Sequence, residues 1–254
     1  MGRTTESLKV VLYQTSLEEG KEMIHPRLLG NTIDGSNSRE NVARMLASGM
    51  IMNSEGWIEG PPDKIIQSPI PEASIQAKIK PTGSILHSNS APGLTPWQSL
   101  IKYWTRKDIT GEAHFQVPLS FPGIQAVPVT RKADCNYKGN FFYKDGEAKG
   151  YVSFETADLG QASLKTKEWE LDQLEFMISA NFLICLCYDA ACSACPTPSS
   201  SGIDYHSKFK EWSIYTGKTC PGAARIRQMD YIRIEVANRL AEFFKQGGGK
   251  CVGT

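Results

Sequence analysis

The sequence lacks a long apolar run, a glycosylation site of the Asn-x-Ser/Thr type and an excess of either charge. Its 28 Lys and Arg residues face 27 Asp and Glu residues, a formal net charge of +1, so there is no global basic excess of the kind that coats nucleic acid. The longest apolar run, residues 182–188, is too short to cross a bilayer and suits a buried strand. We therefore expect no transmembrane segment.

The common catalytic motifs are also missing. There is no His-Glu-x-x-His pair, no Gly-x-Ser-x-Gly elbow, no Walker-type phosphate loop and no dinucleotide fingerprint. The four histidines are scattered along the chain, and for each we expect a core or surface role: His25, His87, His114 and His206. These absences predict a protein that is not an enzyme and needs no cofactor.

Four of the seven cysteines gather in one stretch, Cys185, Cys187, Cys192 and Cys195. Four thiolates could surround a zinc ion, but Cys185 and Cys187 would share one face of a strand, and only the second pair has the spacing of a zinc knuckle. Buried apolar roles are the favoured interpretation, with zinc the alternative. The odd cysteine count predicts free thiols, and the start of the chain has no signal-peptide pattern, so we expect the protein in the cytosol.

The composition, 41% hydrophobic and 22% charged over 254 residues, is typical of one globular domain. Residues 1–73 are expected to form a flexible N-terminal arm, with one short helix near residues 38–48 and a proline-containing linker over residues 60–71. The compact core is then expected to span residues 74–254.

Periodicity within the core indicates both strands and helices. Strands are expected at 75–79, ending in a turn at 81–83, at 113–118, and in a hairpin that joins 140–143 to 150–155. One helix is expected from residue 96, with Trp97, Leu100, Ile101 and Trp104 on one face, and another over residues 229–243. Residues 168–177 fit a helix or a strand, and a helix followed by a strand is favoured. The predicted class is α+β, a mainly antiparallel sheet packed by a few helices.

Basic residues cluster on the last helix and at the end of the first core helix. Such clusters can bind anionic partners or can be solvated faces. The candidates are Arg225, Arg227, Arg233, Arg239, Lys245, Lys102, Arg106 and Lys107.

The order of these features resembles a rhabdovirus matrix protein. Residues 74–83 followed by 97–104 look like the first core strand and helix of that family, and residues 137–139 leading into 149–155 look like a later part. The arm carries Pro61-Pro62-Asp63-Lys64 instead of a Pro-Pro-x-Tyr motif, which favours a plant-infecting branch. The resemblance implies a structural assembly protein that associates with itself, with a nucleocapsid or other ribonucleoprotein, with an anionic membrane surface and with a viral glycoprotein tail.

On this interpretation no small-molecule substrate is expected, and the protein resides in the virion, the host cytoplasm and the host nucleus, as a peripheral membrane protein. One alternative is a viral RNA-binding accessory protein, such as a movement protein or a silencing suppressor. A second alternative is a zinc- or thiol-dependent enzyme that uses the cysteine cluster.

Overall fold

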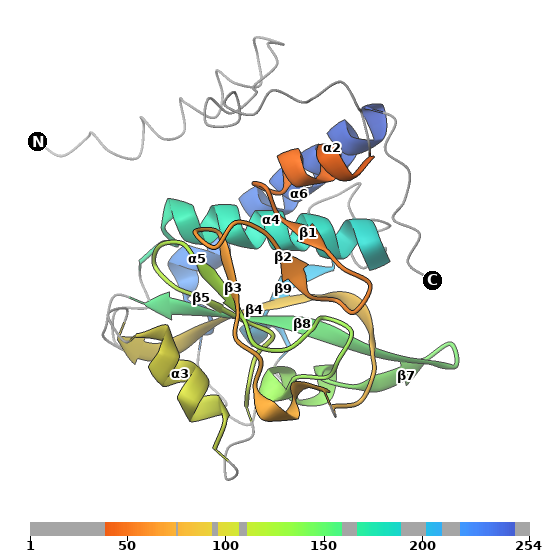
Figure 1. The fold of residues 1–254 in the computed structure, drawn as a ribbon. Coiled ribbons are helices and arrows are strands. Elements are labelled where there is room, and N and C mark those ends of the chain that lie inside the picture. The colour runs from red at the N-terminus through yellow and green to blue at the C-terminus, as the bar shows by residue number, and fades with distance from the viewer. Residues whose placement is uncertain are drawn as a thin grey trace, which may run out of the picture. The chain divides into compact units, whose positions relative to one another are not determined.

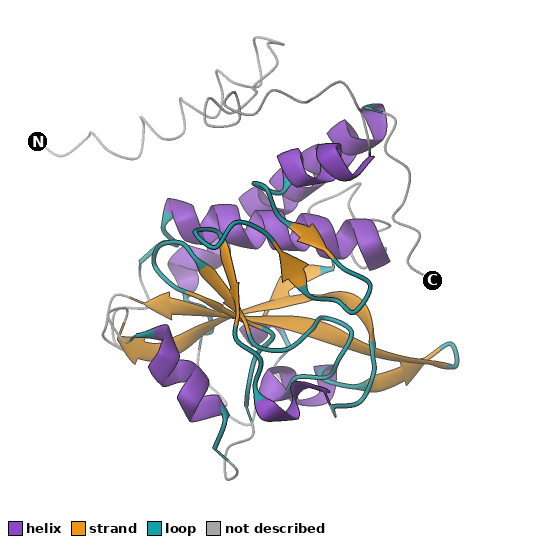
Figure 2. Cartoon of the chain, viewed as in Figure 1, coloured by secondary structure: helices purple, strands orange, loops and turns teal. Residues whose placement is uncertain are grey.

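The computed structural model describes residues 39–74, 76–92, 96–106, 111–158, 167–188, 202–209 and 219–246. Figure 1 labels the elements and Figure 2 colours them by type. The helices are α2 (Arg39–Leu46), α3 (Trp97–Trp104), α4 (Leu171–Tyr188), α5 (Ala223–Arg227) and α6 (Met229–Lys245), with 3-10 turns η2 (Pro71–Ser74), η3 (Asp134–Gly139) and η6 (His206–Lys208). The strands are β1 (Ile51–Met52), β2 (Ile58–Glu59), β3 (Ile65–Gln67), β4 (Lys80–Pro92), β5 (Phe115–Val117), β6 (Gly123–Gln125), β7 (Phe142–Lys144), β8 (Glu147–Asp158) and β9 (Ile203–Tyr205).

The predicted α+β class is confirmed. Seven strands form one sheet in the order β3-β6-β5-β8-β4-β9, with β7 added beside β8. The sheet is mixed rather than mainly antiparallel: β5–β6 and β7–β8 are antiparallel, whereas β3–β6, β5–β8, β8–β4 and β4–β9 are parallel. The two long strands β4 and β8 lie at its centre, and parallel strands of this kind are buried on both faces.

Alternation along the central strands separates the two faces of the sheet. Ser84 Oγ bonds Asn181 of α4, and Leu86 and Phe154 are paired across β4 and β8 in the core that α4 completes. Successive side chains of a strand point to opposite faces. The next pair in register, His87 and Glu155, therefore projects from the face opposite α4. His87 and Glu155 therefore lie on the face of the sheet that is turned away from the main apolar core.

The expected strand over residues 182–188 is wrong, because these residues end the 18-residue helix α4. The helix is apolar all round, so periodicity could not distinguish it from a buried strand. It is long and apolar enough to cross a membrane by length and composition, but 72% of that window is buried inside the fold. Its Phe182 ring meets Phe243 of α6 at 6.2 Å, and α6 lies along α4 in Figure 1.

The predicted boundary at residue 74 lies within folded structure, not at its edge. Val42, Met50 and Ile58 belong to the main core cluster, and β3 is a strand of the seven-stranded sheet. The prolines at 61 and 62 occupy the connection between β2 and β3, where they interrupt no ladder. Residues 39–73 are therefore part of the packed unit, whereas residues 1–38 of the expected arm lie outside the described residues.

The expected hairpin is confirmed as β7 and β8, which pair around Asp145 and Gly146. Both residues have positive φ, 57° and 77°, as a two-residue hairpin loop requires. The expected turn at residues 81–83 is wrong, because β4 runs through it with a shift in register. Gly83 is needed there: a Cβ would lie 2.1 Å from the carbonyl oxygen of Gly202, which leads into β9.

Candidate metal centre

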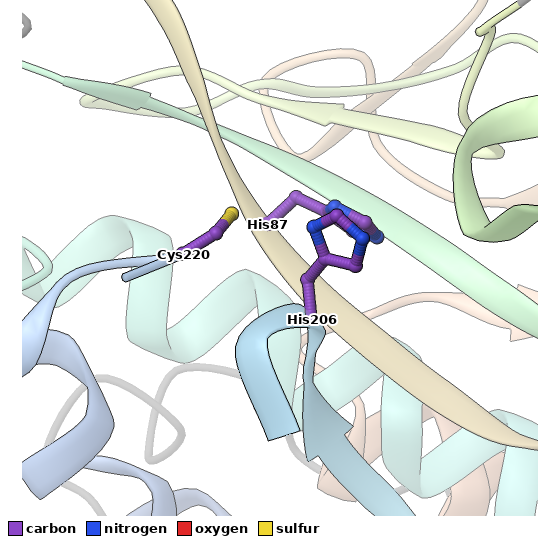
Figure 3. Close-up of side chains that lie close together, drawn as sticks. All are labelled: His87, His206 and Cys220. Atoms are coloured by element: carbon purple, nitrogen blue, oxygen red, sulfur yellow. The ribbon is translucent and has the colours of Figure 1, made fainter. Parts of the chain in front are cut away.

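Two imidazoles and a thiol from three separate segments meet on the face of the sheet opposite α4. His87 lies on β4, His206 begins η6 directly after β9, and Cys220 precedes α5. One ligand atom from each lies within 4.8 Å of the other two, and the imidazole centroids are 4.5 Å apart. Figure 3 shows the three side chains converging from their different elements.

Strand pairing explains why the three residues meet. Strand β9 is parallel to β4 with Tyr205 opposite Leu86, so the next residue of each strand, His206 and His87, lies at the same level. Cys220 is tied to both segments: its Sγ accepts the Ser88 backbone N–H at 3.3 Å, and its carbonyl accepts the Ser207 N–H at 3.0 Å. The backbone N–H groups of Ser88 and Ser207 thus hold Cys220 beside the two histidines.

The His87 ring is held neutral. It is 3% exposed, and its burial, followed by the proximity of His206, lowers the pKa from 6.5 to about 3. A second charge 4.5 Å away would repel the first in this buried site. A neutral ring keeps one nitrogen lone pair, which is the form that binds metal.

The donor set fits a zinc ion. Ligands at about 2.0–2.3 Å from tetrahedral zinc lie roughly 3.3–3.8 Å apart. The three atoms already lie within 4.8 Å of one another, so small side-chain rotations would close the site. Two imidazoles and one thiolate suit zinc, and three protein ligands leave a fourth position open, as catalytic zinc sites do. His206 is only half-buried, so one side of the cluster meets solvent.

A second group, His87, Cys135 and Glu155, also lies within 4.8 Å and shares the same histidine. The charges around Cys135, the thiol of this second group, differ from those around Cys220, the thiol of the first. Burial and the Glu155 carboxylate raise the pKa of Cys135 well above its usual value, and its Sγ lies 3.0 Å from Glu155 Oε1. Cys135 is therefore a protonated hydrogen-bond donor to Glu155.

A thiolate at Cys220 would instead have favourable neighbours, the Ser88 N–H and the buried guanidinium of Arg225, whose charge interacts with Cys220. The neutral His87 ring has one nitrogen lone pair, so it can bind a metal ion in only one of the two groups. We therefore assign the candidate metal centre to His87, His206 and Cys220, and call these residues the metal triad below.

Three of the arginines predicted to bind anionic partners are turned inward instead. Arg225 is 1% exposed and donates to Ser88 Oγ and the Ala157 carbonyl. Arg233 donates to the Ile203 carbonyl and to Asp204. Arg239 donates to the Leu46 carbonyl, Ser179 and Glu175. Their partners come from distant segments, so helical position alone could not reveal them. Of the other candidates, Arg227, Lys245, Lys102 and Arg106 are exposed, and Lys107 lies outside the described residues.

The cysteine stretch does not form a site in the described part of the chain. Cys185 is buried within α4 and Cys187 is half-buried on the same helix, whereas Cys192 and Cys195 lie outside the described residues. Among the histidines, His114 has the expected core role, bonded to Ser153 and the Arg131 carbonyl. Sequence reasoning missed His87, His206 and Cys220, because no short motif joins residues so far apart.

Comparison with known proteins gives matches among solved structures only. No protein-family model and no curated protein matches the chain. A mutant endolysin from Bacillus subtilis has 19% identity and a TM-score of 0.45 over 68% of this chain and 98% of its own. An N-acetylmuramoyl-L-alanine amidase from Clostridium intestinale has 12% identity and a TM-score of 0.44 over 67% of this chain and 97% of its own. An AmpD derivative has 14% identity and a TM-score of 0.45 over 72% of this chain and 99% of its own.

The expected resemblance to a rhabdovirus matrix protein is wrong, because the similar structures are endolysin and amidase domains. The expectations that followed from it are wrong as well: a structural assembly role with ribonucleoprotein, membrane and self-association partners, an absence of catalysis and an absence of a small-molecule substrate. The RNA-binding alternative is not supported either. A proline-containing segment followed by a strand, a Trp-bearing helix and further strands is a layout that unrelated α+β chains can share.

Proposed function

We propose that this chain is a zinc-dependent hydrolase whose metal is held by His87, His206 and Cys220. The observation that carries the proposal is the convergence of three ligand atoms, from two imidazoles and one thiol, within 4.8 Å, with the Glu155 carboxylate beside His87. Glu155 Oε1 lies 3.9 Å from His87 Nδ1. A three-ligand site with an adjacent carboxylate has the parts that metal-assisted hydrolysis requires.

Zinc bound here would supply Lewis-acid chemistry, polarising a carbonyl oxygen and making water a stronger acid. The chain supplies the proton transfer. Glu155 Oε1 is the atom placed to accept the proton that an attacking water loses, and to return it to the departing amine or alcohol. The Cys135 thiol, 3.0 Å from the same oxygen, orients the carboxylate.

Assays with defined substrates determine which class of bond the protein cleaves. The amide bond of N-acetylmuramoyl-L-alanine, from which the Clostridium intestinale amidase takes its name, is the first substrate to test. Simple chromogenic amides and esters complete the panel, because zinc with a carboxylate base cleaves both bond types.

Metal analysis of two cysteine variants tests the assignment of the ligands. We expect about one zinc per chain in the purified protein and in Cys135→Ala, and a loss of most zinc in Cys220→Ala, because only Cys220 is a ligand. Zinc measured by mass spectrometry against protein concentration gives the result. Loss from Cys135→Ala with retention in Cys220→Ala would assign the metal to the second group instead.

Removal of the metal tests the activity. A chelator that strips zinc should abolish hydrolysis, and stoichiometric zinc should restore it. In Cys135→Ala we expect hydrolysis to fall about tenfold, because Glu155 loses a hydrogen bond that orients it, and in Cys135→Ser to fall less, because a hydroxyl still donates. A protein that holds tight zinc and cleaves no member of the panel would identify a structural site and overturn the proposal.

A further inference from the structure

Directly behind His87, on the side away from Glu155, lies the amide of a buried asparagine. His87 Nε2 is 2.7 Å from Asn136 Oδ1, and Asn136 is fully buried at 0% exposure. Asn136 belongs to η3, which packs against β8 on the same face of the sheet as His87. The contact joins the candidate metal centre to a segment that supplies no ligand to it.

The hydrogen-bond network fixes which way the Asn136 amide points. Its Nδ2 donates to the Tyr151 carbonyl at 2.9 Å, and a carbonyl can only accept. Oδ1 is then the atom that faces His87, and it too can only accept. His87 Nε2 must therefore carry the hydrogen. A neutral imidazole has one N–H, so the lone pair lies on Nδ1, the nitrogen that faces Glu155.

The backbone around Asn136 is built to hold this orientation. The Asn136 N–H donates to the side chain of Asn140, four residues on, so both its main chain and its side chain are anchored. The next residue, Tyr137, has φ 49° and ψ −113°, a backbone conformation that residues with a side chain rarely adopt. Tyr137 is 54% exposed, so packing of its ring does not account for the strained turn. Strain of this kind gathers at functional sites, where the surrounding structure maintains it.

We propose that Asn136 is a positioning residue that locks His87 as its Nε2–H tautomer and so directs Nδ1 at the metal. This inference rests on the proposed function, and it identifies Asn136 as the residue that holds the proposed ligand His87 from outside the metal site. Partners of this type set the tautomer and ring orientation of metal-bound histidines, and their loss weakens metal binding about 10- to 100-fold.

Two substitutions at Asn136 separate this role from simple packing. Asn136→Leu keeps the volume and removes the acceptor, so we expect zinc affinity to fall about 10- to 100-fold. Both variants lose the Nδ2 donor to the Tyr151 carbonyl, but Asn136→Asp retains an oxygen facing His87 Nε2, so we expect its zinc affinity to stay within about threefold of the unmodified protein. The matched control is Asn181→Leu, the same change at a buried asparagine on the opposite face of the sheet, which should leave zinc affinity unchanged.

Zinc affinity is measured by competition with a chromophoric chelator, and the cobalt form gives a second readout. The visible bands of tetrahedral cobalt should shift in Asn136→Leu and remain in Asn136→Asp and Asn181→Leu. Unchanged affinity and an unchanged cobalt spectrum in Asn136→Leu would overturn the inference.

A measurement on the metal-free protein distinguishes failure of this inference from failure of the proposed function. Long-range nitrogen–proton NMR of His87 should show a protonated Nε2 in the unmodified protein and a mixture of tautomers in Asn136→Leu. A protonated Nδ1 in the unmodified protein refutes the role of Asn136 whether or not zinc binds. A protein with the expected tautomer that takes up no zinc would refute the metal centre and the direction of Nδ1 toward it.

Discussion

Replacing Glu155 by Gln is expected to slow hydrolysis by about 10²- to 10⁴-fold, the usual contribution of a general base. Gln keeps the volume of the side chain and an oxygen that can accept the Cys135 thiol hydrogen bond, but it cannot take a proton from water. Zinc should remain bound, because Glu155 is not a member of the metal triad. The turnover number with the best substrate of the panel and the zinc content of the same sample give both results.

The matched control is Glu112→Gln. Glu112 is an acid at 5% exposure whose pKa is raised by burial, and replacing it by Gln makes the same change of side chain at a site outside the metal triad. It bonds Gln76 and the Gly111 N–H rather than the cluster. We expect Glu112→Gln to retain activity within a few-fold. Equal activity in Glu155→Gln and the unmodified enzyme would exclude Glu155 as the base.

Replacing Arg225 by Met is expected to destabilise the fold by about 3–5 kcal/mol, the cost of leaving one partner of a buried ion pair without its counter-charge. Arg225 is 1% exposed, and its guanidinium lies 3.7 Å from the Asp158 carboxylate, itself 7% exposed. It also bonds Ser88 and Ala157 and lies over the Trp169 ring. Met fills a similar volume, so the loss comes mainly from charge and hydrogen bonds. Chemical denaturation gives the free energy of unfolding.

Two further variants test that explanation. Arg227→Met is the same change two residues along the same segment at an exposed side chain, and it should alter stability by no more than about 0.5 kcal/mol. Arg225→Met combined with Asp158→Asn removes both charges and should recover part of the loss. If the double variant is as unstable as the sum of the two single variants, the ion pair does not explain the cost.

The sequence by itself determined the elements whose patterns are local. The 3.6-residue spacing of Met229, Ile232 and Val236 predicts α6, and all three are buried as expected. Asp145-Gly146 predicts the hairpin turn because both residues tolerate positive φ. The α+β class followed from such elements. In the apolar run over residues 182–188 the pattern fits a buried strand as well as a buried helix. The expected strand was wrong there, and packing of α4 in the main core decided for a helix.

The order of the sheet and the candidate metal centre were decided only by the tertiary structure. Parallel pairing of β4 with β8 and β9 sets His87 beside Glu155 and His206, and no spacing within one segment encodes those pairings. The same holds for Arg225, which looks like a surface charge on a short helix until its distant partners enclose it. Local sequence determines which residues can form a helix or a turn. Which distant side chains meet depends on strand pairing, because burial of the whole apolar surface selects one arrangement.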